Sequence, residues 1–288
     1  MSPSEITPES KAAGRRAIAT AYELGFTLFD NAAIYCNGES ERLLGETLKQ
    51  VSGMRERVII ATKCGIRPHG DPAPDAPTRY DFSANYIVES CEQSVRRLGI
   101  ETIDLFMLHR PDYLADPAEI AGAFTQLQKA GKVRHFGVSN FRPSLVQALQ
   151  MACPMPLLVN QVEISLANLA AFMDGTLDQC LMMRMTPMAW SPLAAGLIGA
   201  GASNLLPAQK IYQPGKFLGE LSSIAQSRGV NRTVIAIAWL LKHPSGIMPI
   251  IGTTNPERLR ECAKADEIEL TREEWYRLLI AARGEPLP

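Results

Sequence analysis

The chain has 288 residues, of which 46% are hydrophobic and 20% charged, a composition typical of globular proteins that excludes a disordered or fibrous chain. Lysine and arginine number 29 against 30 for aspartate and glutamate. The resulting net charge of -1 gives no electrostatic reason to expect nucleic acid or an anionic membrane as a partner. We therefore expect a small-molecule partner.

The sequence also bears on location. No apolar run approaches the roughly 18 residues that a transmembrane helix needs. The first residues, MSPSEITPESK, lack the basic and apolar regions of a signal peptide. The 6 cysteines form no C-x-x-C pair and are not densely spaced, which favours reduced thiols over a disulfide framework. We expect a cytoplasmic protein.

Short β-branched runs alternate with amphipathic helical patterns along most of the chain. In chain order, the predicted strands cover 26–31, 58–63, 103–109, 135–140, 157–162, 185–190 and 247–252. Helices are predicted over 8–24, 83–98, 117–131, 143–153, 216–228 and 232–242. A capping-box pattern at Thr271 and Glu274 predicts a final helix, and Gly99 and Gly131 are expected to end two earlier ones.

This alternation predicts a single α/β domain over residues 1–288 of the (β/α)8 TIM-barrel class, which typically takes about 250 residues. Only seven strands are predicted, because the first one follows the helix over 8–24. We therefore expect either a missing N-terminal strand or a barrel that is open there. The long connections 66–82 and 193–215 predict surface loops at strand C-termini, where barrel loops build a site.

Four side chains of different chemistry follow the predicted strand ends: Asp30, Tyr35, Lys63 and His109. Each has an ordinary structural interpretation, since Asp30 and Lys63 can form a buried ion pair, His109 can be a core histidine and Tyr35 can pack. Because barrel strands end on one face, an acid, a phenol, an amine and an imidazole are predicted to share one pocket. The set lacks a metal-ligand pattern such as H-E-x-x-H, so no metal is expected.

Several segments support a family assignment. Residues 25–36 read GFTLFDNAAIYC, 61–65 read ATKCG, 104–112 read DLFMLHRPD and 137–141 read GVSNF; then come NQVE, AWSPL and PIIGTTNPERLR at 160–163, 189–193 and 249–260. In this order, and over nearly the whole chain, they resemble the aldo-keto reductase family, whose members carry G-x-x-x-x-D-T-A-x-x-Y-G, T-K, H-x-P and G-V-S-N-F. The chain is most similar to bacterial oxidoreductases with an M-A-W-S strand and a C-terminal L-T-R-x-x-W helix.

The resemblance implies an oxidoreductase that reduces an aldehyde or ketone to an alcohol by hydride transfer from NADPH. Tyr35 would donate the proton to the carbonyl oxygen. A free phenol is a weak acid at neutral pH, but the Lys63 ammonium would stabilise the phenolate. Asp30 would hold Lys63 in place, and His109 would orient the carbonyl oxygen and could assist proton relay.

The same resemblance implies a cofactor site. Ser139, Asn140 and Gln161 would bind the nicotinamide carboxamide, and Trp190 would stack on the ring. The residues expected at the pyrophosphate and adenosine phosphate are Ser191, Leu193, Gly252, Thr253, Thr254 and Arg258. A guanidinium near the adenosine ribose suits a 2′-phosphate, so NADPH is favoured and NADH is the alternative.

The chain departs from the family pattern at some positions. Asn31 stands for threonine, Cys36 for glycine, Cys262 for an adenine-contacting asparagine and Gly252 for a lysine that often serves the 2′-phosphate. Two alternatives therefore stay open. One is a nicotinamide-binding but catalytically poor barrel that acts as a redox sensor or partner subunit, and the other is an isomerase or aldolase with Lys63 as a Schiff-base amine. The substrate and the oligomeric state are left open.

Overall fold

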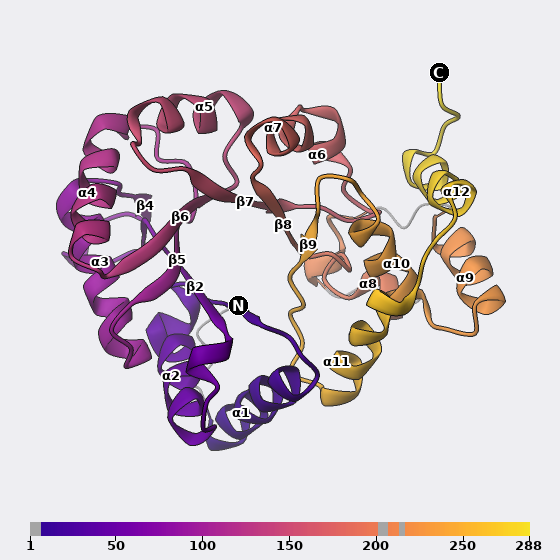
Figure 1. Ribbon diagram of the computed structural model, residues 1–288, viewed down its shortest axis with the longest axis horizontal. Coiled ribbons are helices and arrows are strands. Elements are labelled where there is room, and N and C mark those ends of the chain that lie inside the picture. The colour runs from indigo at the N-terminus through magenta and orange to yellow at the C-terminus, as the bar shows by residue number, and fades with distance from the viewer. Residues whose placement is uncertain (1–6, 201–206, 213–216) are drawn as a thin grey trace. The chain divides into compact units, whose positions relative to one another are not determined.

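The seven predicted strands are all present in one sheet of the computed structural model, which describes residues 7–200, 207–212 and 217–288 (Figure 1). They are β1 (Leu28–Asp30), β2 (Ile59–Cys64), β5 (Ile103–Leu108), β6 (Val133–Ser139), β7 (Leu157–Glu163), β8 (Thr186–Trp190) and β9 (Met248–Pro249). Residue contacts are concentrated within two compact units, 1–160 and 161–288, and the boundary between them lies inside β7. One domain over residues 1–288 stays a prediction.

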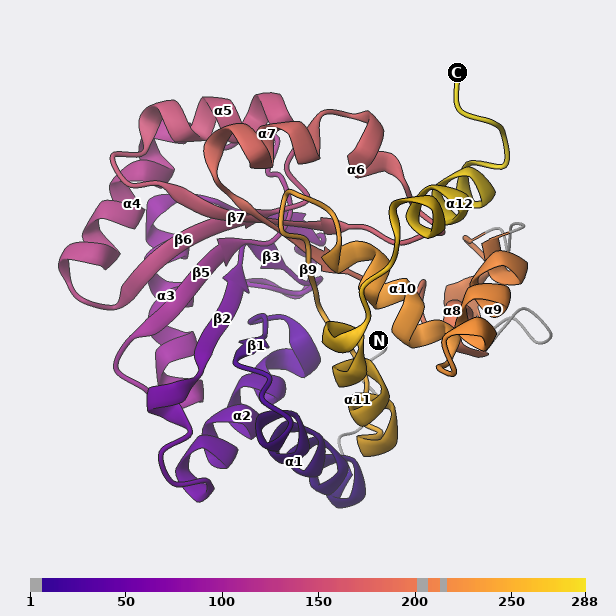
Figure 2. The ribbon, with the colours of Figure 1, turned by 45° about the vertical axis from the view of Figure 1, so that its right-hand side comes forward.

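In the first unit the strand order is β1-β2-β5-β6-β7, and the pairs from β1 to β6 are parallel. Its helices are α1 (Pro8–Glu23), α2 (Glu39–Gln50), α3 (Ala84–Leu98), α4 (Pro117–Lys129) and α5 (Pro143–Ala152). Helices α3 and α4 lie along one side of strands β2, β5 and β6 in both views (Figures 1 and 2). All the strand ends that carry predicted catalytic residues therefore belong to this unit.

Helix α2 was not predicted, although its apolar residues have helical spacing. Leu44 and Leu48 lie one turn apart and are buried. Gly45 allows a close crossing with α3, because a Cβ atom there would lie 2.3 Å from the backbone oxygen of Leu98. The helix therefore depends on a tertiary contact that its short apolar stripe alone does not reveal.

The predicted loop over 66–82 contains a short antiparallel pair, β3 (Ile66–Arg67) and β4 (Arg79–Tyr80). Its polar contacts explain why it is ordered. The Arg67 guanidinium lies 2.7 Å from an Asp81 carboxylate oxygen and 4.0 Å from the centre of the Tyr86 ring. The Asp112 carboxylate also accepts a hydrogen bond from the Phe82 N–H, which ties this segment to the loop after β5.

The second unit contains β8 and β9 as a parallel pair together with most of the shorter helices. The elements are α6 (Ala170–Met173), α7 (Thr176–Met183), α8 (Leu197–Ala200), α9 (Phe217–Ser227), α10 (Arg232–Leu241), α11 (Pro256–Ala263), α12 (Arg272–Arg283) and 3-10 turns at Pro207–Gln209 and Lys264–Glu267. The capping box at Thr271 and Glu274 is confirmed, as is the left-handed Gly99 after α3. Among the described residues, no helix is both long and apolar enough to cross a membrane.

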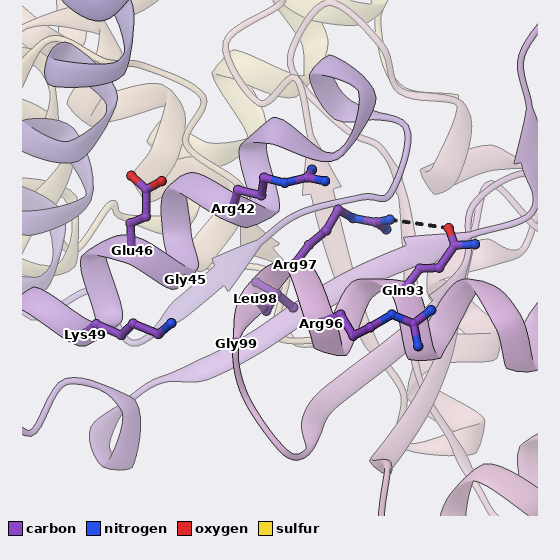
Figure 3. A pocket seen from close by; sticks show the side chains of 9 residues that line it. All are labelled: Arg42, Gly45, Glu46, Lys49, Gln93, Arg96, Arg97, Leu98 and Gly99. Carbon is purple, nitrogen blue, oxygen red and sulfur yellow. Dashed lines mark hydrogen bonds between the residues drawn. The ribbon is translucent and has the colours of Figure 1, made fainter.

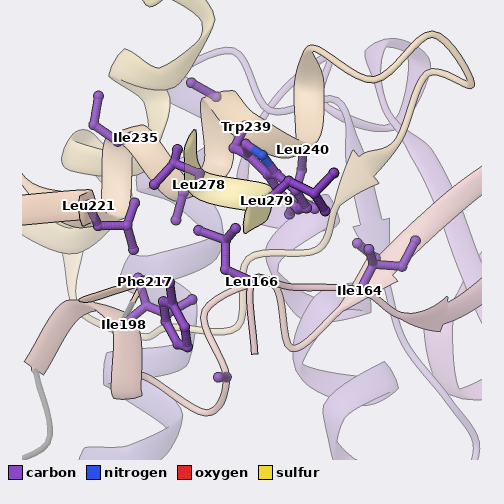
Figure 4. Packing of buried hydrophobic residues seen from close by; sticks show 14 of the residues in the cluster. Ile164, Leu166, Ile198, Phe217, Leu221, Ile235, Trp239, Leu240, Leu278 and Leu279 are labelled. Atoms are coloured by element: carbon purple, nitrogen blue, oxygen red, sulfur yellow. The ribbon is translucent and has the colours of Figure 1, made fainter. Parts of the chain in front are cut away.

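An apolar cluster joins α9, α10 and α12 in this unit (Figure 4). Trp239 and Trp275 stack with ring centres 5.2 Å apart. Each indole N–H donates to the backbone oxygen of the other residue, at 3.1 Å from Trp239 and 3.0 Å from Trp275. The pair therefore stacks a half-buried ring on a fully buried one and satisfies both indole donors.

The prediction of a surface loop over 193–215 is wrong in part. Ala194, Leu197, Ile198 and Tyr212 are buried and belong to the apolar cluster. The segment is rich in small and turn-forming residues, which predict a loop. The few apolar side chains that pack inward do not change this prediction, because they form no regular pattern. Residues 201–206 and 213–216, including the start of the predicted helix over 216–228, lie outside the described residues.

Candidate active site

Three of the predicted catalytic residues stand at the ends of neighbouring parallel strands. Asp30 is the last residue of β1, Lys63 is next to last in β2, and His109 directly follows β5. Backbone hydrogen bonds continue the ladder past the strands, from Ala33 N–H to Lys63 O at 3.0 Å and from His109 N–H to Cys64 O at 2.9 Å. The prediction that these side chains share one face is confirmed by this register.

Lys63 is fully buried and is the centre of the site. Its Nζ lies 2.7 Å from Asp30 Oδ2, donates to the backbone oxygen of Asn31 at 2.8 Å, and lies 3.4 Å from the Tyr35 hydroxyl oxygen. An ammonium group has three donors, and three oxygens surround this one. Each donor of the Lys63 ammonium group therefore has an oxygen within reach.

This arrangement disfavours Lys63 as a Schiff-base amine. Such an amine must be neutral and must present its lone pair to a carbonyl carbon. Instead, the Lys63 nitrogen is enclosed by three oxygen acceptors, one of them a carboxylate oxygen of Asp30. The geometry suits an ammonium that stabilises negative charge on the neighbouring phenol oxygen.

Tyr35 and His109 complete the group. Their rings meet edge to face, with centres 5.7 Å apart and an interplanar angle of 81°. Tyr35 is 38% exposed, whereas Lys63 behind it is fully buried. Burial, and then the charges of Lys63 and Arg110, lower the pKa of His109 to about 3, so its imidazole is neutral at physiological pH.

The turn after Tyr35 is unusual, because three successive residues have left-handed backbone conformations. The φ angles are 49° at Cys36, 55° at Asn37 and 84° at Gly38. Gly38 has a steric reason to be glycine, since a Cβ there would lie 2.5 Å from the Arg97 side chain. Cys36, which replaces the glycine of the family pattern, holds a conformation that disfavours a β-carbon.

A second set of buried charges was missed by the sequence analysis. Glu41 on α2 is fully buried, accepts a hydrogen bond of 2.6 Å from the Thr62 hydroxyl, and lies 2.6 Å from Arg97 Nε. Its position could have been found, because Glu41 is three and seven residues before Leu44 and Leu48, on the buried face of the helix. Thr62 directly precedes Lys63, so this set adjoins the site.

The predicted carboxamide-binding residues lie in or directly after two strands. Ser139 is buried at the end of β6, and Gln161 is buried in β7. The Asn140 side-chain amide donates to the backbone oxygen of His109 at 3.2 Å and to Ser139 Oγ at 2.8 Å. Asn140, with a φ of 62°, is thus oriented directly beside His109.

In the second unit, Trp190 ends β8 and is half-buried, as are Ser191 and Leu193 in the turn that follows. Ser191 has a φ of 49°. Glycine and threonine residues at 252–254 lead from β9 to Asn255, whose side chain caps α11 by accepting from the N–H groups of Glu257 and Arg258. Of the predicted phosphate-binding residues, Gly252, Thr253, Thr254 and Arg258 therefore lie around a helix N-terminus, where the helix dipole favours anions, whereas Ser191 and Leu193 follow β8.

Arg258 is exposed in the first turn of α11, and no ion pair joins it to another described residue. The carboxylate of the neighbouring Glu257 forms an ion pair with Arg260, with 2.5 Å between Glu257 Oε1 and Arg260 Nη1. Cys262, by contrast, is buried, and burial raises the pKa of its thiol to about 11. A cation at a helix N-terminus next to two threonine hydroxyls fits an anionic phosphate group.

The sequence matches the model of the Aldo/keto reductase family over residues 3–282. The chain belongs to the aldo/keto reductase family. The resemblance seen in the motifs is thus confirmed, and the membership makes this protein an NAD(P)H-dependent oxidoreductase.

Known proteins similar to this chain are also named as reductases or dehydrogenases. A 6-dehydroglucose reductase from Novosphingobium aromaticivorans is 39% identical over 279 residues, which cover 95% of this chain and 86% of the relative. A glycerol dehydrogenase structure from Gluconobacter oxydans superposes with a TM-score of 0.86 at 25% identity, over 98% of this chain and 89% of that one. An aldo/keto reductase from Klebsiella pneumoniae, solved in complex with NADP and acetate, has a TM-score of 0.77 at 25% identity, over 98% and 88%. The α/β barrel class of the aldo-keto reductases is confirmed by these neighbours.

Proposed function

We propose that this protein reduces an aldehyde or ketone to an alcohol with NADPH, and that Tyr35 is the proton donor. The observation that supports this most directly is the position of the Lys63 ammonium, which lies 3.4 Å from the Tyr35 hydroxyl oxygen and 2.7 Å from Asp30. A phenol beside a fixed ammonium can release its proton because the charge left behind is stabilised.

NADPH, when bound, supplies the hydride that reduces the carbonyl carbon. The Tyr35 hydroxyl donates its proton to the carbonyl oxygen as negative charge develops there, and the Lys63 ammonium stabilises the resulting phenolate. Asp30 holds the ammonium in place from the other side. Its second carboxylate oxygen, Oδ1, and the Asn31 Oδ1 are buried and accept no hydrogen bond from a described residue. Two such acceptors suit a ligand that brings hydroxyl donors, as the ribose of a nicotinamide nucleotide does.

His109 acts in this proposal as a neutral hydrogen-bond donor. Its lowered pKa, about 3, keeps the imidazole uncharged at physiological pH. A neutral imidazole can orient the carbonyl oxygen without competing with Tyr35 as the acid. The Asn140 amide, bonded to the His109 backbone oxygen, supports this orientation.

The cofactor residues proposed on the first unit are Ser139 and Asn140, and those on the second are Gln161, Trp190, Ser191, Leu193, Gly252, Thr253, Thr254 and Arg258. Arg258 supports NADPH over NADH, because its guanidinium is exposed and free of ion pairs with described residues. Gly252 offers no side chain to replace the lysine of the family pattern. Selectivity for NADPH therefore depends on Arg258.

The substrate class follows from the relatives only as a proposal. Two of them are named for a sugar-derived carbonyl compound and for a polyol, 6-dehydroglucose and glycerol. We therefore propose a small polyhydroxylated carbonyl compound as substrate. A cytoplasmic location, as the sequence predicts, belongs to the same proposal.

The deciding experiment replaces Tyr35 by phenylalanine and measures NADPH oxidation with 4-nitrobenzaldehyde and with sugar-derived aldehydes. Loss of the phenol proton is expected to lower kcat by about 100-fold or more. NADPH binding, followed by fluorescence quenching, is expected to persist because Tyr35 is assigned to proton transfer. Tyr22→Phe in α1 is the matched control and is expected to leave turnover unchanged.

Retained turnover in Tyr35→Phe would remove Tyr35 from its role. A wild-type protein that binds NADPH without oxidising it with any carbonyl of the panel would instead support the redox sensor or partner subunit. Arg258→Ala tests the cofactor separately, since it is expected to raise the KM for NADPH by about tenfold and to leave that for NADH unchanged. Equal effects on both cofactors would contradict a 2′-phosphate contact.

A further inference from the structure

Glu41 is a fully buried carboxylate that no step of the proposed reaction uses. It lies in the first turn of α2, which begins directly after the turn that carries Tyr35. One carboxylate oxygen accepts from the Thr62 hydroxyl on β2, and the other pairs with Arg97 on α3, both at 2.6 Å. Glu41 thus connects three elements of the first unit.

Two hydrogen bonds join strand β2 to the segment from Tyr35 to Glu41. At one end Lys63 donates to the Tyr35 hydroxyl oxygen, at 3.4 Å, and at the other Thr62 donates to Glu41. Side chains alternate along a strand, so Thr62 and Lys63 point to opposite faces of β2. The bond to Glu41 therefore fixes α2 against the back of β2, while Tyr35 meets Lys63 at its front.

Arg97 completes the connection on the third side. Its side chain packs beneath Gly38, at the end of the Tyr35 turn, and its guanidinium also contacts Gln93 and Ser94. Arg97 donates to the side-chain oxygen of Gln93 (Figure 3). Both residues line a cavity of about 590 Å³ between α2 and α3. The Arg97 side chain is only 15% exposed in spite of this opening.

A buried ion pair is weak evidence for stability, because removing two charges from water costs free energy that apolar residues would not. What such a pair supplies is a specific geometry, since its oxygens accept from donors at defined positions only. Here the two donors come from β2 and α3, on either side of the segment that starts at Tyr35.

We propose that Glu41, held by Arg97 and bonded to Thr62, is a positioning residue that sets the distance between the Tyr35 hydroxyl and the Lys63 ammonium. This inference rests on the proposed function, because the distance matters for turnover only if Tyr35 donates the proton. Proton transfer is sensitive to small displacements, and a shift of about 1 Å can lower a rate by about 100-fold.

The test replaces Thr62 by valine, which has nearly the same shape but no hydroxyl. The Glu41 to Arg97 pair is left in place, so no buried charge loses its counter-ion. We expect kcat for NADPH-dependent carbonyl reduction to fall at least about tenfold, with KM values for NADPH and the aldehyde within about twofold of the wild type. Thr62→Ser, which restores the hydroxyl, is expected to restore kcat.

Asp104 offers a matched control. It is a second buried carboxylate of the first unit, at the start of β5, and it pairs with Arg55 at 2.9 Å and Arg134 at 2.7 Å. It also accepts from the Ile60 N–H of β2, three residues before Lys63. Asp104→Asn is expected to weaken folding as Thr62→Val does, and to leave kcat within about twofold of the wild type.

An unchanged kcat in folded Thr62→Val, or an equal loss of kcat in Asp104→Asn, would overturn the proposal. If Thr62→Val does not fold, Glu41→Asp takes its place, since it keeps the charge and shortens the side chain by one methylene. Crystal structures of the wild type and the variant give a measurement that does not depend on enzymatic activity. The distance from Tyr35 Oη to Lys63 Nζ should lengthen by about 1 Å or more; an unchanged distance refutes positioning even if the wild type proves inactive.

Discussion

The two compact units differ in the polar side chains that they bury. Among the described residues, the buried lysine, histidine, aspartate and glutamate side chains are Glu41, Lys63, Asp104 and His109, and all belong to the first unit. The second unit instead contains the apolar cluster around Trp239, and its buried polar residues are neutral. Among the described residues, carboxylate, ammonium and imidazole groups are thus buried only in the unit that contains the proposed catalytic residues.

This difference shows that the energetically unfavourable burial of charged groups is confined, among the described residues, to the first unit. A buried charge costs free energy unless it is paired and hydrogen-bonded, and Lys63 and Glu41 each have such partners. The second unit needs no comparable arrangement at α11, because the candidate phosphate-binding residues Gly252, Thr254 and Arg258 lie exposed around the start of that helix. Chemistry requires a dry, fixed environment, whereas phosphate binding can use exposed donors.

The largest effect is expected from the apolar interior of the second unit. Trp239→Ala removes a fully buried indole, its stack on Trp275 and its hydrogen bond to the Trp275 backbone oxygen. The free energy of unfolding, measured with urea, is expected to fall by about 3–5 kcal/mol. Met182→Ala, at an exposed position of the same unit, should change it by less than about 0.5 kcal/mol. Equal effects of the two substitutions would mean that the cluster is not the core of this unit.

The buried ionisable groups predict a pH dependence of stability for the first unit. The unfolded chain protonates His109 below about pH 6.5. The folded protein does so only below about 3, because burial and Lys63 disfavour the imidazolium. The unfolded state therefore binds more protons in this window, and stability is lost as the pH falls from 6.5 toward 3.

Comparison with His109→Gln isolates this contribution from other titrating groups. Between about pH 6 and pH 4, the unfolding free energy of the wild type should fall more steeply than that of the variant, by about 1 kcal/mol per pH unit. Urea titrations across this range provide the measurement. Parallel curves for the two proteins would show that His109 is not kept neutral by its surroundings.

The smallest effect concerns the turn after Tyr35. Cys36 has a φ of 49°, a conformation in which its β-carbon is crowded. Cys36→Gly is expected to raise the free energy of unfolding by about 0.5–1 kcal/mol, which thermal melting can detect. Cys36→Ala removes the thiol but keeps the β-carbon, so it should give no gain. A gain in both variants would point to the thiol rather than the backbone.

The strand positions could be predicted because short apolar runs that alternate with helical patterns are typical of buried parallel strands and fit few other structures. Asp30, Lys63 and His109 follow from the same pattern, since parallel strands end on one side of a sheet. Helix α2, the β3 and β4 pair and the buried part of 193–200 were not predicted from the sequence. Their stability comes from contacts such as Gly45 on Leu98 and Arg67 on Tyr86, which join residues far apart in the chain.

The sequence alone determined the order of strands and helices, the family, and the residue types available for the reaction, because each depends on local pattern and motif. The tertiary structure decided which of these side chains meet. It alone showed that Lys63 directs its donors at Asp30, Asn31 and Tyr35, and that Glu41 lies buried behind β2. Distances between residues from different elements depend on packing and on hydrogen bonds across the fold, and no local pattern of residues specifies them.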